Sequence, residues 1–250
     1  SAAERGGRVG ERCRSNAESL VRAVETCGGL GIRAFRISSG LFPLKTHPFL
    51  RYALKSLPGG GEADAAVRAA ARRAAELGIR LSFHPDQFVV LNSPRPEVVA
   101  AALEDLRYHL EIAEAAGADV VNIHGGGAYG DPAAALERLR RILDGLPGGI
   151  RKMLTLENDD RVFPPSLLLP VCEASGIPFV YDIHHHRCLP DGLSPEDVTR
   201  RAFATWDREP LFHVSSPASG WEAGRDPKPH ADYLDPADVP AFWLDRKSVV

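Results

Sequence analysis

Apolar residues follow two alternating periodicities along the chain. Short runs rich in β-branched residues, such as 119–124, are typical of strands that are buried on both faces. Between these runs lie longer stretches in which apolar residues recur at three- and four-residue steps, as in the segment from Ser93 to Gly117. The alternation predicts strand–helix units repeated along the chain.

Turn and capping residues set the expected bounds of these elements. The pattern predicts strands at 32–37, 80–84, 119–124, 153–157, 178–182 and 211–215, and helices at 14–27, 62–77, 93–117, 132–145, 165–175 and from 194 onward. A short final helix is expected near Asp235, and Ser248 looks like the start of another strand. Repeated units of this kind predict a parallel sheet with right-handed crossovers.

Polar residues at the strand ends distinguish a barrel from an open, doubly wound sheet. They occupy the carboxyl ends of five predicted strands: His84, His124, Glu157, Asp182 and His213. In a barrel such positions converge on one mouth, whereas in an open sheet they spread along a crevice. No GxGxxG sequence follows the first predicted strand. We therefore predict a (β/α)8 TIM barrel in the α/β class, as one domain over residues 1–250.

The strand count leaves the predicted barrel incomplete at both ends. The visible strands would be the second to the seventh, with the first either absent or hidden in the poorly patterned residues 1–10. The chain begins with Ser1 instead of Met, and the eighth strand would stop at Val250. We expect a barrel truncated at its first and last strands.

Composition narrows the cellular setting. The net charge of −3 gives no support for nucleic-acid binding by itself, although bound divalent cations would reverse the sign of an acidic site. The four cysteines form no CxxC pair, which argues against a zinc ribbon and favours reduced thiols. No signal peptide and no membrane-spanning apolar run are visible. We expect a soluble cytoplasmic protein.

Imidazoles and carboxylates at the strand ends predict a metal site. A single histidine at a strand end is more often an ordinary polar group, but five such groups at equivalent positions point to bound cations. This donor set suits zinc, manganese or iron. Divalent cations at a barrel mouth can promote phosphodiester hydrolysis, and they can also isomerise a sugar. The donors alone do not choose between these reactions.

Five motifs in order resemble the UV damage endonucleases: FRISSGLFPLKTHP, LSFHPDQFVVLNSP, LRYHLEIAEAAGADVVNIHGGGAYG, LENDD and YDIHHH. The resemblance runs from residue 13 to residue 246 and is specific because the motifs occur together. It implies a barrel related to endonuclease IV, with up to three metal ions, commonly manganese. It also implies incision 5′ to UV photoproducts or abasic sites in double-stranded DNA, as the start of excision repair. We expect a monomer that associates with the nucleoid when it acts on DNA.

The resemblance also implies roles for individual residues. The metal ligands would be His84, His124, Glu157, Asp182, His185, His213 and His230. Glu157 would be the carboxylate shared between two ions, and catalysis is expected to depend on Glu157, His124 and His213. The Asp-x-x-His spacing selects His185, with His184 and His186 as adjacent alternatives.

Gln87 and Phe88 would be the residues that probe the duplex at the lesion. An aromatic ring can replace base stacking there, and a damaged step costs less to open.

Three departures from the family pattern bear on competence. The last-strand glutamate ligand would lie beyond Val250, and the first-strand segment with a tyrosine near the DNA is also missing. Some members carry a modified lysine two residues before the equivalent of His213, where this chain has Leu211. We expect altered metal affinity, or a solvent ligand in that place.

Two other functions remain open from the sequence. A metal-dependent sugar isomerase or epimerase on the same barrel would use Gln87 and Phe88 as inward-facing pocket walls. A non-catalytic lesion binder, or a degraded paralogue, would bind damaged DNA without cutting it.

Overall fold

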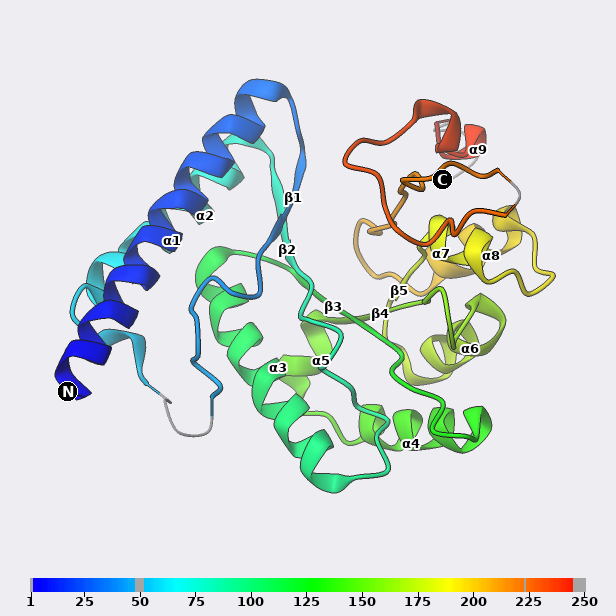
Figure 1. The fold of residues 1–250 in the computed structure, drawn as a ribbon, viewed down its shortest axis with the longest axis horizontal. Helices are drawn as coiled ribbons and strands as arrows, with labels where there is room; N and C mark the ends of the chain where they lie inside the picture. Colours follow the sequence, from blue (N-terminus) through cyan, green and yellow to red (C-terminus); the bar gives the residue numbers. More distant parts are fainter. Residues whose placement is uncertain (1, 48–51, 223, 245–250) are drawn as a thin grey trace. The chain divides into compact units, whose positions relative to one another are not determined.

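The structure is a computed structural model that describes residues 2–47, 52–222 and 224–244 (Figure 1). The chain divides into two compact units. Unit 1 comprises residues 1–89, 100–122 and 148–153, and unit 2 comprises residues 90–99, 123–147 and 154–250. The single domain expected over residues 1–250 stays a prediction.

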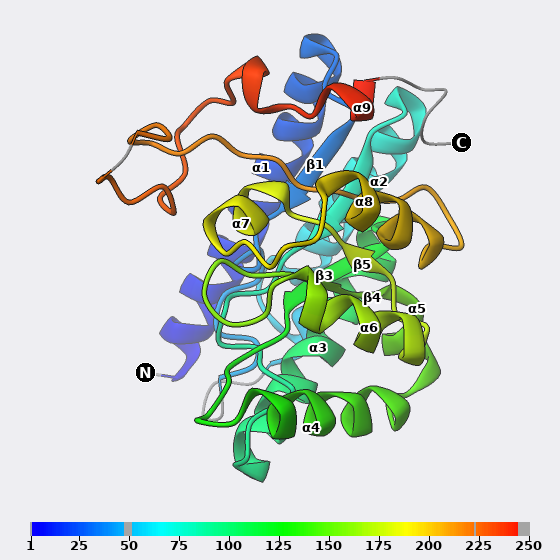
Figure 2. The same cartoon turned by 90° about the vertical axis from the view of Figure 1, so that its right-hand side faces the viewer.

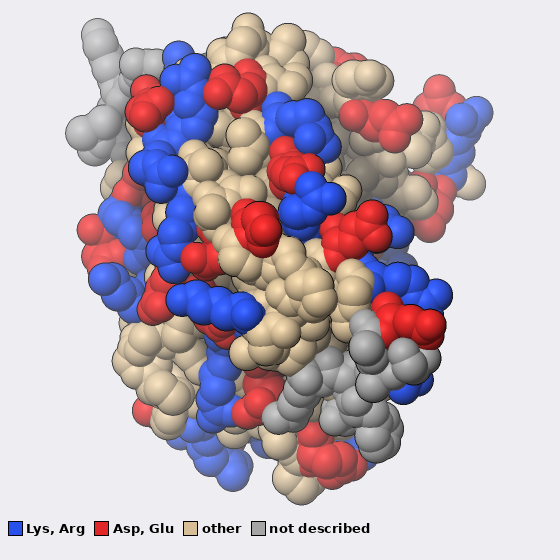
Figure 3. Space-filling view, turned by 90° about the vertical axis from the view of Figure 1, so that its left-hand side faces the viewer, with Lys and Arg blue, Asp and Glu red and all other residues tan. Residues whose placement is uncertain are grey.

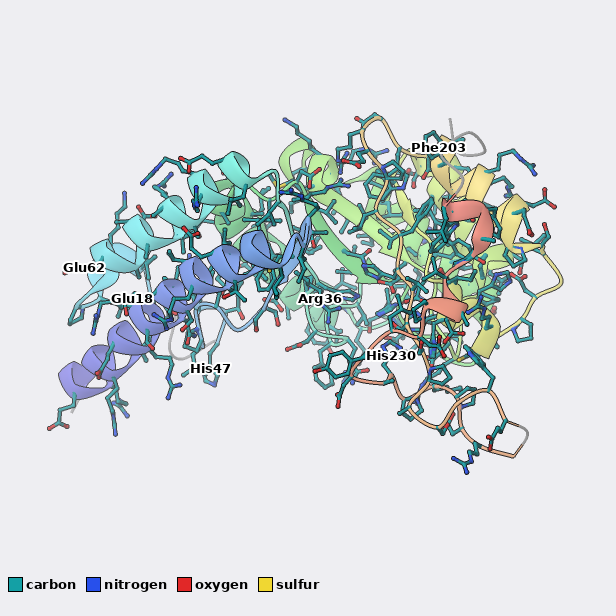
Figure 4. All side chains as sticks on the ribbon, turned by 90° about the horizontal axis from the view of Figure 1, so that it is seen from above. Glu18, Arg36, His47, Glu62, Phe203 and His230 are labelled. Atoms are coloured by element: carbon teal, nitrogen blue, oxygen red, sulfur yellow. The ribbon has the colours of Figure 1, made fainter. Side chains whose placement is uncertain are left out.

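Two long helices pack side by side in unit 1, α1 (Ala2–Leu30) and α2 (Gly60–Leu77). Figure 4 labels Glu18 on α1 and Glu62 in the first turn of α2. Their buried faces carry mostly small side chains at helical spacing: Cys13, Ala17, Leu20, Val24 and Cys27 on α1, and Ala63, Val67, Ala70 and Ala74 on α2. Such faces allow close packing of the two helices.

The strands of unit 1 run parallel. Strand β1 (Ala34–Ile37) pairs along its whole length with β2 (Arg80–Phe83), and β2 pairs with the start of β3 (Val120–His124). Helix α3 (Pro96–Ala116) precedes β3, and two short elements complete the unit, η1 (Leu54–Ser56) and α5 (Gly148–Met153). The order strand, helix, strand with parallel pairing is that of an α/β fold.

Unit 2 continues the same alternation. Strands β4 (Leu154–Glu157) and β5 (Phe179–Val180) pair in parallel. The helices are α4 (Pro132–Asp144), α6 (Pro165–Ser175), α7 (Ile183–Cys188) and α8 (Pro195–Ala204), followed by η2 (Pro236–Asp238) and α9 (Ala241–Leu244). Helix α6 packs against both α4 and α8 (Figure 2). The fully buried strand residues Leu154, Leu156, Phe179 and Val180 form part of the core.

Two expectations from the sequence differ from the structure, and a third falls outside the described residues. Residues 2–10 belong to helix α1, so they hide no first strand. A side-chain carbon at Gly10 would lie 1.9 Å from the carbonyl oxygen of Pro58, which shows that this glycine permits a close approach of the chain. Segment 211–215 forms only an isolated bridge at His213. Residues 248–250, where the last strand was expected, lie outside the described residues.

Prolines explain the lost strand at 211–215. Pro210 and Pro217 flank the segment and have no amide proton, so neither can extend a ladder of hydrogen bonds. Only His213 exchanges backbone hydrogen bonds with its neighbour, accepting one from Ile183 and donating one to Tyr181. No helix in the described ranges is both long and apolar enough to cross a membrane.

Candidate metal centre

Glu157 is the last residue of β4 and is 1% exposed. Its Oε1 lies 3.0 Å from Nδ1 of His213 and 3.5 Å from Nδ1 of His185. Strand β4 delivers the carboxylate, because the residues of this parallel strand are all buried and the strand ends at this position. Glu157 therefore has two imidazoles within contact distance.

Asp182 follows β5 and is the N-cap of α7. Its Oδ1 accepts a hydrogen bond of 2.8 Å from the backbone N–H of His185, while Oδ2 lies 3.6 Å from that residue's Nδ1. Ligand-capable atoms of Glu157, Asp182 and His185 all lie within 4.8 Å of one another. Two buried carboxylates and an imidazole thus converge within unit 2.

A single β-bridge places His213 beside this group. The backbone N–H of His213 donates to Tyr181 at 2.9 Å, and its carbonyl accepts from Ile183 at 3.2 Å. These two bonds flank Asp182, the bridge partner of His213. A residue predicted at a strand end thus reaches the expected place although its strand is missing.

Two further histidines of unit 2 border the same group. The ring centroid of His124, the last residue of β3, lies 5.6 Å from that of His185. His230, labelled in Figure 4, is fixed by an antiparallel bridge to Pro217, and its ring centroid lies 5.7 Å from that of His185. Partial burial, together with the positive charge that nearby His184 would carry, lowers the pKa of His230. The neutral ring is the form that binds metals.

The three consecutive histidines of α7 have three different environments. His185 donates from Nδ1 to the carbonyl oxygen of Asn158 at 2.9 Å, which leaves the lone pair on Nε2. His186 is bound on both sides, by the hydroxyl of Tyr181 at 2.7 Å and by the carboxylate of Asp191 at 2.9 Å. Both ring nitrogens of His186 are therefore engaged by protein groups, and His185 stays the predicted ligand of the three.

His184 is fully buried and differs from both neighbours. Its Nδ1 donates to the carbonyl oxygen of Ser215 at 3.1 Å, and its ring stands edge-on to that of His230 with centroids 4.6 Å apart. Nε2 has no hydrogen-bond partner among the described residues. His184 thus packs against the ring of His230, whereas His185 contacts the carboxylates of Glu157 and Asp182.

Asn158 is a site residue that sequence reasoning missed. It is 0% exposed and makes a closed pair of hydrogen bonds with the backbone of Asp182, donating to the carbonyl at 2.8 Å and accepting from the N–H at 2.9 Å. The available signal was its place directly after Glu157 in the LENDD motif. Asn158 ties the end of β4 to the start of α7.

His84, Gln87 and Phe88 lie in unit 1, at and just after the end of β2. His84 is half-buried, with Nδ1 3.1 Å from the carbonyl oxygen of Pro85. Gln87 is exposed and Phe88 is 81% exposed. These two side chains are accessible to a partner and do not form the inward-facing pocket wall expected for a sugar isomerase.

The donor set in unit 2 fits divalent cations. Burying an ionised carboxylate costs several kcal/mol unless opposite charge compensates it. Glu157 and Asp182 are both buried, and the side chains that face them at short range are imidazoles. Oxygen and imidazole donors in one cluster suit manganese, zinc or iron, so the residues present fit the implied metals.

Several basic residues outside this cluster are paired with acids. Arg73 of α2 contacts Glu25 at 2.7 Å and Glu76 at 3.0 Å, and Arg140 of α4 contacts Glu137 and Asp144 in the same way. Figure 3 shows Lys and Arg interspersed with Asp and Glu over the face that lies on the left of Figure 1. These arginine–carboxylate pairs lie on solvent-exposed helix faces.

Known proteins resemble the chain over most of its length. The family model for UV-endonuclease UvdE matches residues 1–245. The UV DNA damage endonuclease of Bacillus velezensis is 37% identical over 236 residues, which cover 89% of this chain and 69% of the relative. The crystal structure of SacUVDE has a TM-score of 0.82 and 32% identity, and the match covers 91% of this chain and 76% of that one.

A more distant likeness shows the fold. Endonuclease IV from Thermus thermophilus has a TM-score of 0.58 and 21% identity, over 85% of this chain and 76% of that one. Together with SacUVDE it confirms the α/β fold of the TIM-barrel type. The match of the family model and the identity to the relatives establish the family. The chain belongs to the UV-endonuclease UvdE family, a family of DNA repair endonucleases.

Proposed function

We propose that the protein is a metal-dependent endonuclease that hydrolyses the phosphodiester 5′ to UV photoproducts or abasic sites in double-stranded DNA. The observation that carries the proposal is the convergence of buried Glu157 and Asp182 with His185 and His213 in a chain of this family. Membership of the family favours an endonuclease over a sugar isomerase.

Seven residues are proposed to hold up to three cations, manganese in the first place: His84, His124, Glu157, Asp182, His185, His213 and His230. Divalent cations bound there would activate water and neutralise the charge that develops on the phosphoryl oxygens. Glu157 is the proposed shared carboxylate, because imidazoles approach it from both His185 and His213. Catalysis is proposed to depend on Glu157, His124 and His213.

The chain's own hydrogen bonds orient these donors. Asn158 fixes the backbone of Asp182, and the Asp182 cap fixes the first turn of α7. The carbonyl of Asn158 in turn orients the ring of His185, so that its Nε2 is the available donor atom. Leu211 is half-buried and has no ligand atom, so we propose that solvent takes the place of the modified lysine found in some members.

Gln87 and Phe88 are proposed to probe the duplex at the lesion. Their exposure supports the proposal, because a ring that enters a base stack must be accessible before binding. A flipped or unstacked damaged nucleotide would leave a gap that the ring can fill at lower cost than in an intact duplex.

The experiment is a nicking assay on an end-labelled duplex with one abasic site or one cyclobutane dimer, in manganese or in EDTA. We expect a single nick 5′ to the lesion in manganese, no nick in EDTA, and no cutting of the undamaged duplex. Glu157→Gln should lose the activity, whereas Glu173→Gln, which changes an exposed partner of Arg201, should keep it. Tight binding of the damaged duplex without incision by the unaltered chain would refute the endonuclease and indicate a lesion binder.

A further inference from the structure

Tyr129, in the loop after β3, has a backbone conformation that is unfavourable for its residue type. Its φ is 51°, in the left-handed region where a side chain meets the backbone and where glycine is at ease. The side chain is 48% exposed, so burial of the ring does not compensate for this conformation. Strained backbone conformations persist only where the surrounding structure enforces them, and such positions are frequent at functional sites.

The loop around Tyr129 is held rigidly by Asn92. This asparagine is 0% exposed; it donates to the carbonyl of Gly127 at 2.9 Å and accepts from the N–H of the same residue at 3.2 Å. At Gly126, where φ is 90°, a side-chain carbon would lie 2.1 Å from Oδ1 of Asn92. Asn92 and Gly127 are thus joined by a closed pair of hydrogen bonds, and Tyr129 follows two residues later in the same loop.

Arg138 of α4 lies over the ring of Tyr129. Its Nε donates to the carbonyl oxygen of Asn92 at 2.9 Å, and its guanidinium carbon lies 5.8 Å from the centroid of the Tyr129 ring. The ring edge also lies close to Gly127, where an added side-chain carbon would be 3.2 Å from two ring atoms. The ring is thus supported from behind, with its remaining surface open.

We propose that Tyr129 and Arg138 form a contact site for the DNA strand that is cut. In this site the ring packs against a nucleoside and the guanidinium contacts an adjoining phosphate. An exposed aromatic ring beside an arginine suits these two parts of a nucleotide. Gly126 lies two residues after His124, and the loop belongs to the same unit as the buried carboxylates. The inference rests on the proposed function, because DNA is the substrate that it assumes.

The test uses the full chain and a fluorescein-labelled abasic duplex, with affinity measured by anisotropy in EDTA so that no cutting occurs. Tyr129→Gly removes the ring and relieves the backbone, and we expect affinity to fall about tenfold. Tyr129→Phe keeps the ring and should bind within about twofold of the unaltered chain. Arg138→Met should weaken binding and reduce the slope of log affinity against log salt by about one phosphate contact.

Thermal unfolding separates a binding role from a structural one. Tyr129→Gly should unfold at the same temperature as the unaltered chain or higher, because glycine accepts the left-handed backbone. Leu44→Gly is the matched control for the backbone effect on unfolding, because Leu44 has a φ of 62° and is 49% exposed. Its unfolding temperature should likewise stay the same or rise.

Two results would overturn the inference: unchanged DNA affinity in Tyr129→Gly, or a marked loss of thermal stability in that variant. Either result leaves the nuclease proposal standing if the unaltered chain nicks the damaged duplex. Conversely, an unaltered chain that binds but never nicks refutes the nuclease alone, and the affinity ratios still decide the role of Tyr129.

Discussion

Asn158 offers the sharpest test of how the site is held together. Its side chain is completely buried and forms two hydrogen bonds with the backbone of Asp182, at 2.8 and 2.9 Å. The alanine substitution removes both bonds at once. It leaves the buried N–H of Asp182 unsatisfied, whereas the carbonyl keeps the hydrogen bond that it accepts from the backbone N–H of His186 at 3.2 Å. The unsatisfied N–H costs about 1–3 kcal/mol and the second lost bond about 1 kcal/mol, so we expect the free energy of unfolding to fall by about 3 kcal/mol.

Asn16→Ala is the matched control. Asn16 also makes two hydrogen bonds to backbone groups, the carbonyls of Gly40 and Leu41 at 3.2 and 3.0 Å, but it lies in a more exposed setting. Water can replace the lost amide there, so only the net value of the bonds is lost, about 1 kcal/mol. The contrast between the two variants isolates the effect of burial.

The assay is urea unfolding followed by circular dichroism, with the midpoint and slope fitted for each variant. Asn158→Ala should shift the midpoint several times further than Asn16→Ala, at an unchanged slope. Asn158→Asp should be worse still, because its second oxygen would face the carbonyl of Asp182. If the two alanine variants lose the same stability, the amide of Asn158 does not hold Asp182 and the reasoning fails.

Three further predictions concern ligands, pH and helix capping. Glu157→Gln should reduce nicking by more than about 100-fold and abolish the rise in melting temperature on adding manganese, whereas a retained rise would remove Glu157 from the ligand set. Burial lowers the pKa of His109 from its ordinary 6.5, so the native state favours the neutral ring. The neutral His109 ring therefore contributes to stability above its ordinary pKa, and this contribution is lost as the pH falls below that value. His109→Gln should flatten this part of the pH–stability curve, and an unchanged curve would contradict the assignment. Asp131→Ala should cost about 1 kcal/mol in urea unfolding, because Asp131 caps α4 through the N–H of Ala134, and no loss would show that the cap is dispensable.

Much of the fold was predictable because local signals and tertiary structure agree. The Asp131-Pro132 and Ser194-Pro195 pairs start α4 and α8 where capping rules place them, and the buried strand before His124 ends as expected. Strand ends also located the chemistry, since four strand-end side chains of unit 2, Glu157 among them, lie close together. Hydrophobic periodicity and the capping residues were sufficient to predict these features.

Features that depend on long-range contacts were not predictable. The glycine-rich start of α1 has weak helical propensity, and its helix is supported by packing against α2 and the residues before it. Segment 211–215 has strand-like residues but only one bridge, because two prolines limit it. Asn158 belongs to the LENDD motif, but its contact with the backbone of Asp182 joins residues 24 positions apart and appears only in the structure.

The histidine triplet of α7 gives the Asp-x-x-His spacing a structural explanation. Successive residues of a helix point about 100° apart, so neighbouring histidines on α7 must face different surroundings. Asp182 caps the helix and contacts one of them: one oxygen receives the N–H of His185, and the other lies 3.6 Å from Nδ1 of the same residue. The Asp-x-x-His spacing therefore has a structural origin in the first helical turn, where the cap brings carboxylate and imidazole to one side. Because the turn fixes both groups together, a metal that uses one of them finds the other already in place.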